Sequence, residues 1–338
     1  MSKLKLNIFL AISVFLLAFA SCSQQDGPNV PEETGTPMRF RARTDSESRA
    51  VTTNENIREK PFAVWGSFVH TGETSPVTNV FNATPVSFNS ETNSWEYDDT
   101  QYWFPGFTYN FVAIHPAEDK NLAADFSDGS FSFNYSISTA NRVDLLGAHA
   151  SRVCTGDATS TQAVAFSFRH LLAQIHFVLK VDPVVTDKVI VTEAKIYGIN
   201  TTATYSQLPT SDDYGWRTAG NITTKESPYA VSNGVEVAPG KSAHLFPDVN
   251  DTPLLVIPQQ VNINARLELS YKIGESGTVK TVTSDISQAA AHHNGRWQIG
   301  RNHTYSLTIG TDDYIIFDVP TVSGWSLQEG GNHIIQAK

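Results

Sequence analysis

The sequence predicts an all-β protein whose antiparallel sheets stack face to face. From residue 38 onward, short runs of alternating apolar and polar residues are broken by Gly, Pro, Asn, Asp and Ser. Val, Thr, Phe and Tyr, which favour strands, are abundant, and long helical periodicities are scarce. Strands with this spacing are typical of sandwiches rather than of β-α-β units.

Individual strands follow from the same alternation. The runs with the clearest strand character are Phe62–Val69, Phe107–Ile114, Phe131–Ile137, Val189–Ile199, Leu254–Pro258, Leu267–Ile273, Thr304–Ile309 and Tyr314–Val319. The stretch Val164–Leu179 also has some helical spacing, but its Phe and Ile residues favour one long, bulged strand. A short helix is predicted near Asp285–His292, which contains three consecutive alanines.

The length of 338 residues allows one large domain or two ordinary ones. Asp182-Pro183 interrupts two strongly β-like blocks, as expected at a boundary. We therefore expect an N-terminal domain over 38–182 and a C-terminal domain over 183–338, each of normal size.

Composition excludes several classes of protein. A net charge of −10 argues against a nucleic-acid partner, which requires a basic surface. A hydrophobic fraction of 40% argues against both a disordered chain and a membrane protein with many spans. Two cysteines cannot build a disulfide framework.

The N-terminus has the features of an export signal that ends at a cysteine. Lys3 and Lys5 precede a largely apolar run, Ile8–Ala20, which is too short to span a bilayer. Ala20-Ser21-Cys22 resembles the lipobox of bacterial lipoproteins, in which the cysteine is acylated. This predicts a signal peptide over 1–21, a lipid on Cys22 and a polar tether over 22–37. The alternative is an ordinary signal peptide cleaved near Ala20.

No motif for catalysis or metal binding is present, so we expect no catalytic residue, metal or cofactor. HExxH, GxSxG, GxxxxGK[ST] and CxxC are all missing. The remaining candidates have simpler interpretations as solvated turn acids (Asp98-Asp99, Asp212-Asp213, Asp312-Asp313), surface histidines (His292, His293, His303), a hydrogen-bonded core or sheet histidine (His170) and a structural thiol (Cys154). Six tryptophans could include a sugar-stacking platform, although core packing is the commoner role.

The first strand of the body is the most informative feature. Met38–Arg43 places Met38, Phe40 and Ala42 on one face and three arginines on the other. The polar stretch that follows contains Arg49 in a setting where proteases cut. Loss of an edge strand exposes an apolar groove that another extended chain can fill.

At the other end, a short apolar tail with Ile334-Ile335 follows Gly330-Gly331 and could supply such a chain. The alternative interpretation is a basic edge strand and a C-terminus without a special role.

Several separated pieces of the chain resemble the fimbrillin family of lipid-anchored bacterial pilins, the subunits of type V pili. Besides the lipobox and Ser48-Arg49-Ala50, they are Tyr102-Trp103, Tyr109–Pro116, Asp144–Ala148, Val164–Phe177, Leu255–Gln259, Gly300–Leu307 and a β run that ends at Gly324-Trp325. Together these pieces occur in the order of the family and cover nearly the whole chain.

The resemblance implies two transthyretin-like β-sandwich domains in tandem. It also implies export to the outer membrane as a lipoprotein, followed by cleavage by an arginine- or lysine-specific protease. That cut would fall after Arg49, with Arg43 and Arg58 as alternatives, and would remove Met38–Arg43. The C-terminal strand of another pilin subunit, within Ser326–Lys338, would fill the vacated groove.

The function expected is thus that of a non-enzymatic pilin subunit at the cell surface that supports adhesion to an unidentified host or bacterial ligand. The alternative function is a surface glycan-binding lipoprotein built on the same scaffold. A hydrolase is the least favoured class.

Overall fold

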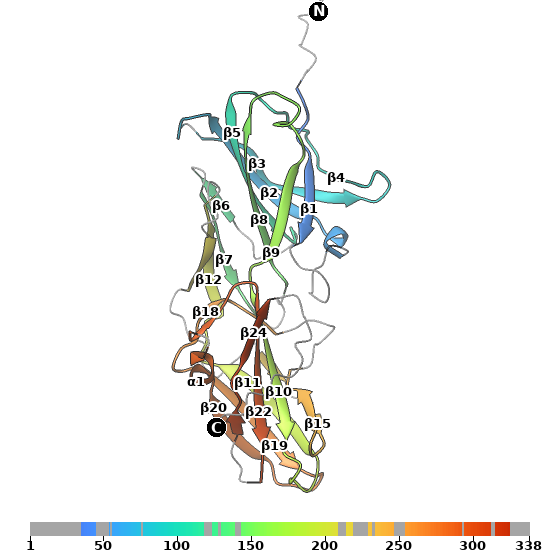
Figure 1. Cartoon of the computed structure of the whole chain (residues 1–338), viewed down its shortest axis with the longest axis vertical. Helices are drawn as coiled ribbons and strands as arrows, with labels where there is room; N and C mark the ends of the chain where they lie inside the picture. The colour runs from blue at the N-terminus through green and yellow to red at the C-terminus, as the bar shows by residue number, and fades with distance from the viewer. Residues whose placement is uncertain are drawn as a thin grey trace, which may run out of the picture. The chain divides into compact units, whose positions relative to one another are not determined.

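The computed structural model describes residues 35–44, 54, 56–75, 77–117, 124–127, 130–138, 143–208, 214–218, 229–231, 234–246, 254–292, 294–311 and 315–324. The all-β prediction is confirmed: these residues form 24 strands, one 3-10 helix (η1, Asn56–Glu59) and one α-helix (α1, Ile286–Ala291) (Figure 1). All of these elements lie in one compact unit, Pro37–Lys338. Neither helix of the described part is long and apolar enough to cross a bilayer.

Seven strands close a barrel in the order β1-β4-β3-β2-β5-β8-β9. They are β1 Phe40–Thr44, β2 Phe62–His70, β3 Thr78–Asn89, β4 Ser94–Glu96, β5 Phe107–His115, β8 Leu146–Cys154 and β9 Val164–His170. Their apolar side chains enclose a core rich in phenylalanine, tyrosine and tryptophan. Most neighbours pair antiparallel, but β1 runs parallel to β9. The prediction of purely antiparallel sheets is therefore wrong at the strand that closes the barrel.

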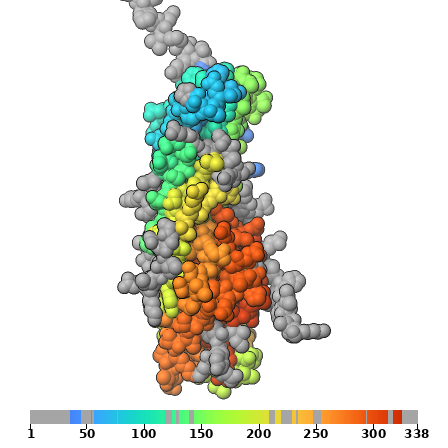
Figure 2. All heavy atoms as spheres, turned by 90° about the vertical axis from the view of Figure 1, so that its left-hand side faces the viewer, coloured from blue at the N-terminus to red at the C-terminus, as the bar shows by residue number. Residues whose placement is uncertain are grey.

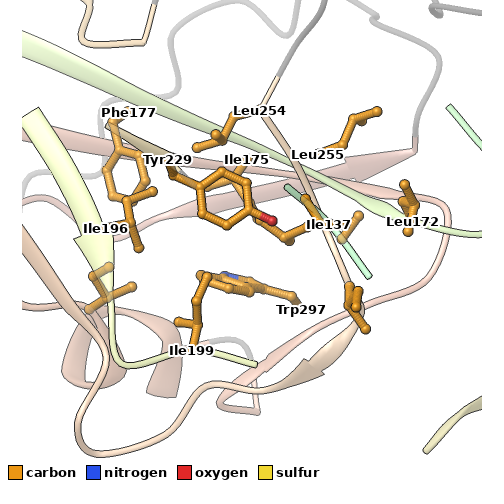
Figure 3. Packing of buried hydrophobic residues seen from close by; sticks show 14 of the residues in the cluster. Ile137, Leu172, Ile175, Phe177, Ile196, Ile199, Tyr229, Leu254, Leu255 and Trp297 are labelled. Atoms are coloured by element: carbon orange, nitrogen blue, oxygen red, sulfur yellow. The ribbon is translucent and has the colours of Figure 1, made fainter. Parts of the chain in front are cut away.

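Two further sheets share a second buried core. One contains β10 Ala173–Val181, β16 Ser242–His244, β17 Leu254–Val256, β22 Arg301–Ile309, β23 Ile315–Phe317 and β24 Thr321–Gly324. The other contains β11 Val189–Tyr197, β14 Tyr229–Val231, β15 Val235–Val237, β19 Arg266–Ile273 and β20 Lys280–Asp285. Here too one central pair, β10 with β22, is parallel. Figure 3 shows side chains of this core pointing toward one another, among them Phe177 of β10, Ile196 of β11 and Trp297.

A four-stranded sheet in the order β13-β12-β7-β6 adds its aromatic face to the same core. It consists of β6 Ala124–Ser127, β7 Ser130–Ser136, β12 Thr202–Gln207 and β13 Tyr214–Thr218, and the remaining strands, β18 Gln259–Gln260 and β21 Arg296–Trp297, pair with each other. The β7–β12 pairing joins residues from both sides of the expected division between 182 and 183. That division stays a prediction.

The individual strand predictions are confirmed to within a few residues by β2, β5, β7, β11, β17, β19, β22 and β23. The short helix is also confirmed as α1. Asp285 caps its N-terminus by accepting a hydrogen bond from Ser287 N at 2.8 Å, which pairs one of the amides that a helix start leaves open.

The expected single strand over Val164–Leu179 is wrong, because the structure divides this segment into β9 and β10. Alternation fails between them: Leu171 and Leu172 are consecutive and both fully buried. Leu171 N donates to Leu145 O at 2.8 Å, whereas Leu172 O accepts from Gly300 N at 2.9 Å. The chain thus leaves the barrel at Leu171 and enters the next sheet at Ala173.

Candidate functional site: the first strand and its groove

The alternation expected for the first strand is seen in the structure. Met38 is 2% exposed and Phe40 is 3% exposed, whereas Arg39, Arg41 and Arg43 face solvent. β1 therefore presents its apolar side to the barrel core and its basic side to water, as a half-buried strand must.

Phe40 lies at the centre of the aromatic core of the barrel. The ring centroids around it belong to Phe81 (5.3 Å), Tyr97 (5.5 Å), Phe166 (5.6 Å), Phe111 (6.1 Å) and Phe62 (6.5 Å). Gly66 on β2 makes room for this packing, because a Cβ there would lie 2.8 Å from the Phe111 ring and 2.9 Å from the Phe81 ring. Without Phe40, these rings would line an open apolar groove.

The backbone of β1 completes the pairing of its neighbours. Phe40–Thr44 pairs residue by residue with Val164–Phe168 of β9, and Phe40 also pairs with Trp95 of β4. On its other side β9 pairs with β8 only at Arg169 and His170. Among the described strands, β1 is therefore the sole ladder partner of Val164–Phe168.

The candidate cleavage arginines differ in their surroundings. Arg43 lies in β1, and its Nε donates to Ser167 Oγ at 2.9 Å. Arg58 lies in η1, and its guanidinium stands 4.5 Å from the centroid of the Phe88 ring. Both residues are in regular backbone, in which a protease cannot bind an extended substrate without local unfolding. Arg49 lies outside the described residues, as do the lipidation candidate Cys22 and the donor candidates Ile334 and Ile335.

A buried polar cluster lies at one end of the barrel. His170 Nδ1 is 2.9 Å from Asp144 Oδ1, which confirms the prediction of a hydrogen-bonded core histidine. His115, which is 3% exposed, ends β5 in register with Leu146 and His170. Burial lowers the pKa of His115 to about 4, and the Asp144 carboxylate offsets only part of this effect. Sequence reasoning missed His115 and Asp144 as a pair, because the residues lie far apart along the chain.

The other candidate residues of the sequence have structural surroundings. The expectation that His303 lies on the surface is wrong: it is buried, and its Nε2 accepts a hydrogen bond from Gln298 N at 3.0 Å. His303 lies on β22 directly opposite the buried Ile175 of β10, where water has little access. His292 is exposed, and Cys154 is fully buried. Asp98 and Asp99 are exposed in a turn.

The tryptophans that the structure describes include three core residues, namely Trp65, Trp103 and Trp297, while Trp95 and Trp216 are partly buried. No group of three His, Cys, Asp or Glu side chains within the described ranges converges as metal ligands do. His293, Trp325 and the acidic pairs Asp212-Asp213 and Asp312-Asp313 lie outside those ranges.

Comparisons with known proteins identify relatives of this chain. A family model described as fimbrillin-like matches residues 48–325. A fimbrial protein from Bacteroides vulgatus has a crystal structure with a TM-score of 0.62 and 17% identity, covering 86% of this chain and 99% of that one. The crystal structure of a candidate cell adhesion protein from Bacteroides uniformis matches with a TM-score of 0.51 and 19% identity, covering 88% of this chain and 100% of that one. The crystal structure of a candidate cell adhesion protein from Bacteroides ovatus matches with a TM-score of 0.50 and 12% identity, covering 87% of this chain and 99% of that one. No protein of curated function matches significantly.

Phe40→Ala should lower the free energy of unfolding of the intact chain by about 3–5 kcal/mol, because it leaves a cavity among five rings. Urea denaturation at pH 7 measures the loss. The matched control is Arg41→Ala on the exposed side of the same strand, with an expected change within about 0.5 kcal/mol. Similar losses for the two variants would contradict a central packing role for Phe40.

The intact chain should lose stability as the pH falls from 7 to 4.5. The unfolded state binds a proton at residue 115 near pH 6.5, whereas folded His115 resists protonation until about pH 4. This histidine should contribute a loss of about 2 kcal/mol over that range. Urea denaturation of wild type and His115→Gln at both pH values measures the difference. Burial also lowers the pKa of His176 to about 4, so the free energy of unfolding of the variant will still fall with pH, though less steeply. If the free energy of unfolding falls equally in the two proteins, the assignment to His115 is contradicted.

Proposed function

The chain belongs to the fimbrillin-like family, and from this premise we propose that it is a structural subunit of a cell-surface fimbria that polymerises by strand exchange. The subunit performs no catalysis. Its task is to hold neighbouring copies together and so to support adhesion. The names of the relatives, which refer to fimbriae and cell adhesion, support this assignment.

The dependence of β9 on β1 carries the proposal. Val164–Phe168 has no other ladder partner among the described strands, and the side chain of Phe40 fills the space between five rings. Removal of β1 would leave open backbone groups beside an apolar groove. Such an edge is a template for another chain. In an intact precursor β1 fills the groove and the chain stays monomeric, so assembly cannot begin until a protease has cut the chain.

Export and anchoring precede that cut in the proposed sequence of events. The signal peptide over 1–21 directs the chain to the outer membrane, where acyl chains on Cys22 hold it through the polar tether. A protease specific for arginine or lysine then cuts after Arg49, which separates β1 and the anchor from the body. The regular backbone at Arg43 and Arg58 counts against a cut at these two residues, and the polar sequence around Arg49 is of the kind that proteases cut.

The proposed donor strand is the C-terminal tail, Ser326–Lys338, of another subunit. Its 13 residues could span about 43 Å when extended, more than twice the length of the five-residue register of β1. Ile335 and Ala337 repeat the apolar alternation of Phe40 and Ala42. Because donor and groove belong to different parts of the chain, the contact is head-to-tail and does not close, so that a filament results.

Limited trypsin treatment of the purified precursor should convert monomers into oligomers, and Arg49→Ala should prevent this conversion. Size-exclusion chromatography follows assembly, and N-terminal sequencing of the product locates the cut. Arg41→Ala, at an arginine that the cut discards, is the control and should assemble normally. Persistent monomers with Ala50 at the N-terminus would count against assembly by this route. If the Arg49→Ala variant is still cleaved as the wild type is, the cleavage site is Arg43 or Arg58 instead.

A mixture of two complementary variants should stop at the heterodimer. Arg49→Ala supplies a tail but keeps its groove filled, whereas trypsin-cut Ile334→Asp/Ile335→Asp has an open groove but a tail too polar to fill it. Each variant alone should remain monomeric, and the mixture should give a single species of twice the mass by light scattering. Long oligomers from either variant alone would show that the strand-exchange scheme is wrong.

A further inference from the structure

Two histidines of the C-terminal half share one face of a sheet. In β10, Phe177 and Leu179 point into the core, so His176 lies on the opposite face. His244 on β16 pairs with Val178, which places it on the same face as His176 and diagonally across from it. The centroids of the two imidazole rings are 5.4 Å apart. The two residues are far apart along the chain and meet only through the pairing of β10 with β16.

The ring of His176 has a nitrogen that lacks a partner. Its Nε2 is buried, and no hydrogen bond reaches it within the described part of the chain. Burial of the ring and, after it, the neighbouring His244 lower the pKa of His176 to about 4. The imidazole is therefore neutral at pH 7, which is the form that binds a metal ion through a ring nitrogen. Buried polar atoms without a partner are uncommon in folded proteins, and a bound ion satisfies such an atom.

The separation of the two rings suits a shared metal ion. With metal–nitrogen bonds of about 2.0–2.1 Å, two imidazoles on one tetrahedral ion have ring centroids roughly 5 Å apart. The torsion that turns an imidazole ring is broad, so a nitrogen of each ring can reach the ion without a strained rotamer. His244 is exposed, which leaves the outer side of the ion open to water. Thr304 lies opposite His176 across the parallel pair, on the same face, where its hydroxyl can hold a bound water.

We propose that His176 and His244 bind one divalent ion of the zinc and copper class, with water in the remaining positions. Imidazole nitrogen is a preferred ligand of these ions, whereas calcium and magnesium select oxygen. The two ligands come from neighbouring strands, and β16, which has three residues, is the last strand in the order of its sheet. The ion would therefore hold this short edge strand against β10. Sequence motifs could not indicate the site, because no local spacing joins the two histidines.

The site is separate from the groove of the proposed assembly. In Figure 2 the blue and cyan residues of the barrel lie apart from the orange residues of the C-terminal half. His176 and His244 belong to the sheet that contains β22, and β1 contributes no residue to that sheet. The site goes beyond the role in assembly and does not depend on it, so the uncut chain serves for the test.

Isothermal titration calorimetry of the uncut full chain with Zn²⁺, after a chelator has removed any metal, tests the proposal. We expect one ion per chain to bind to the wild type and Mg²⁺ at the same concentration not to bind. His176→Gln and His244→Gln should each weaken Zn²⁺ binding by about tenfold or more, since loss of even an outer support of a metal ligand costs roughly 10–100-fold. His70→Gln, at an exposed histidine of the barrel, is the matched control and should bind Zn²⁺ as the wild type does.

Cu²⁺ provides a spectroscopic test of the same site. Electron paramagnetic resonance of the chain with one equivalent of Cu²⁺ should show coupling to two imidazole nitrogens in the wild type. The His244→Gln variant should show coupling to one at most. Because His244 is exposed, this variant keeps the test valid if His176→Gln does not fold, which thermal unfolding without metal verifies.

Several outcomes would overturn the proposal. They are the absence of Zn²⁺ binding by the wild type, equal binding of Mg²⁺, binding that persists unchanged in both histidine variants, and an equal loss in His70→Gln. A Cu²⁺ spectrum that is the same in the wild type and in His244→Gln would do so as well. None of these results bears on the assembly scheme, because the substitutions leave β1, its groove and the tail unchanged.

Discussion

The packing of one phenylalanine holds the barrel closed. Phe40 supplies the side chain around which five other rings arrange themselves, and the strand that carries it supplies the hydrogen bonds that Val164–Phe168 lacks elsewhere among the described strands. Both contributions come from a strand near the start of the described chain. A terminal strand can leave and be replaced without any other segment having to pass through the sheet, which is why the position of Phe40 matters as much as its burial.

Sequence reasoning recovered the features that depend on neighbouring residues. The alternation of Met38, Phe40 and Ala42 places the apolar side of β1 correctly, since successive side chains of a strand point to opposite faces. The three consecutive alanines that predicted α1 are a similarly local signal. The change of sheet at Leu171–Leu172 was not foreseen. Two adjacent buried leucines are compatible with a bulge as well as with a break, and only the hydrogen bonds to Leu145 and Gly300 distinguish them.

Features that depend on distant residues were not accessible in this way. The parallel pairs β1–β9 and β10–β22 connect residues more than 100 positions apart, and alternation is the same for parallel and antiparallel strands. The burial of His303 follows from its place beside β10.

The strength of the β1 contact also explains how a strand can be both essential and replaceable. Burial of Met38 and Phe40 contributes roughly 1.5–3 kcal/mol for each side chain. The ladder bonds to β9 add about 0.5–1.5 kcal/mol each. While β1 is covalently attached, the whole of this free energy stabilises the fold. Once a cut makes β1 a separate peptide, association costs about 4–15 kcal/mol, which is comparable to the sum of those contributions. A cut would thus convert a secure strand into a weakly bound one, and a tail delivered at high local concentration by another subunit could displace it.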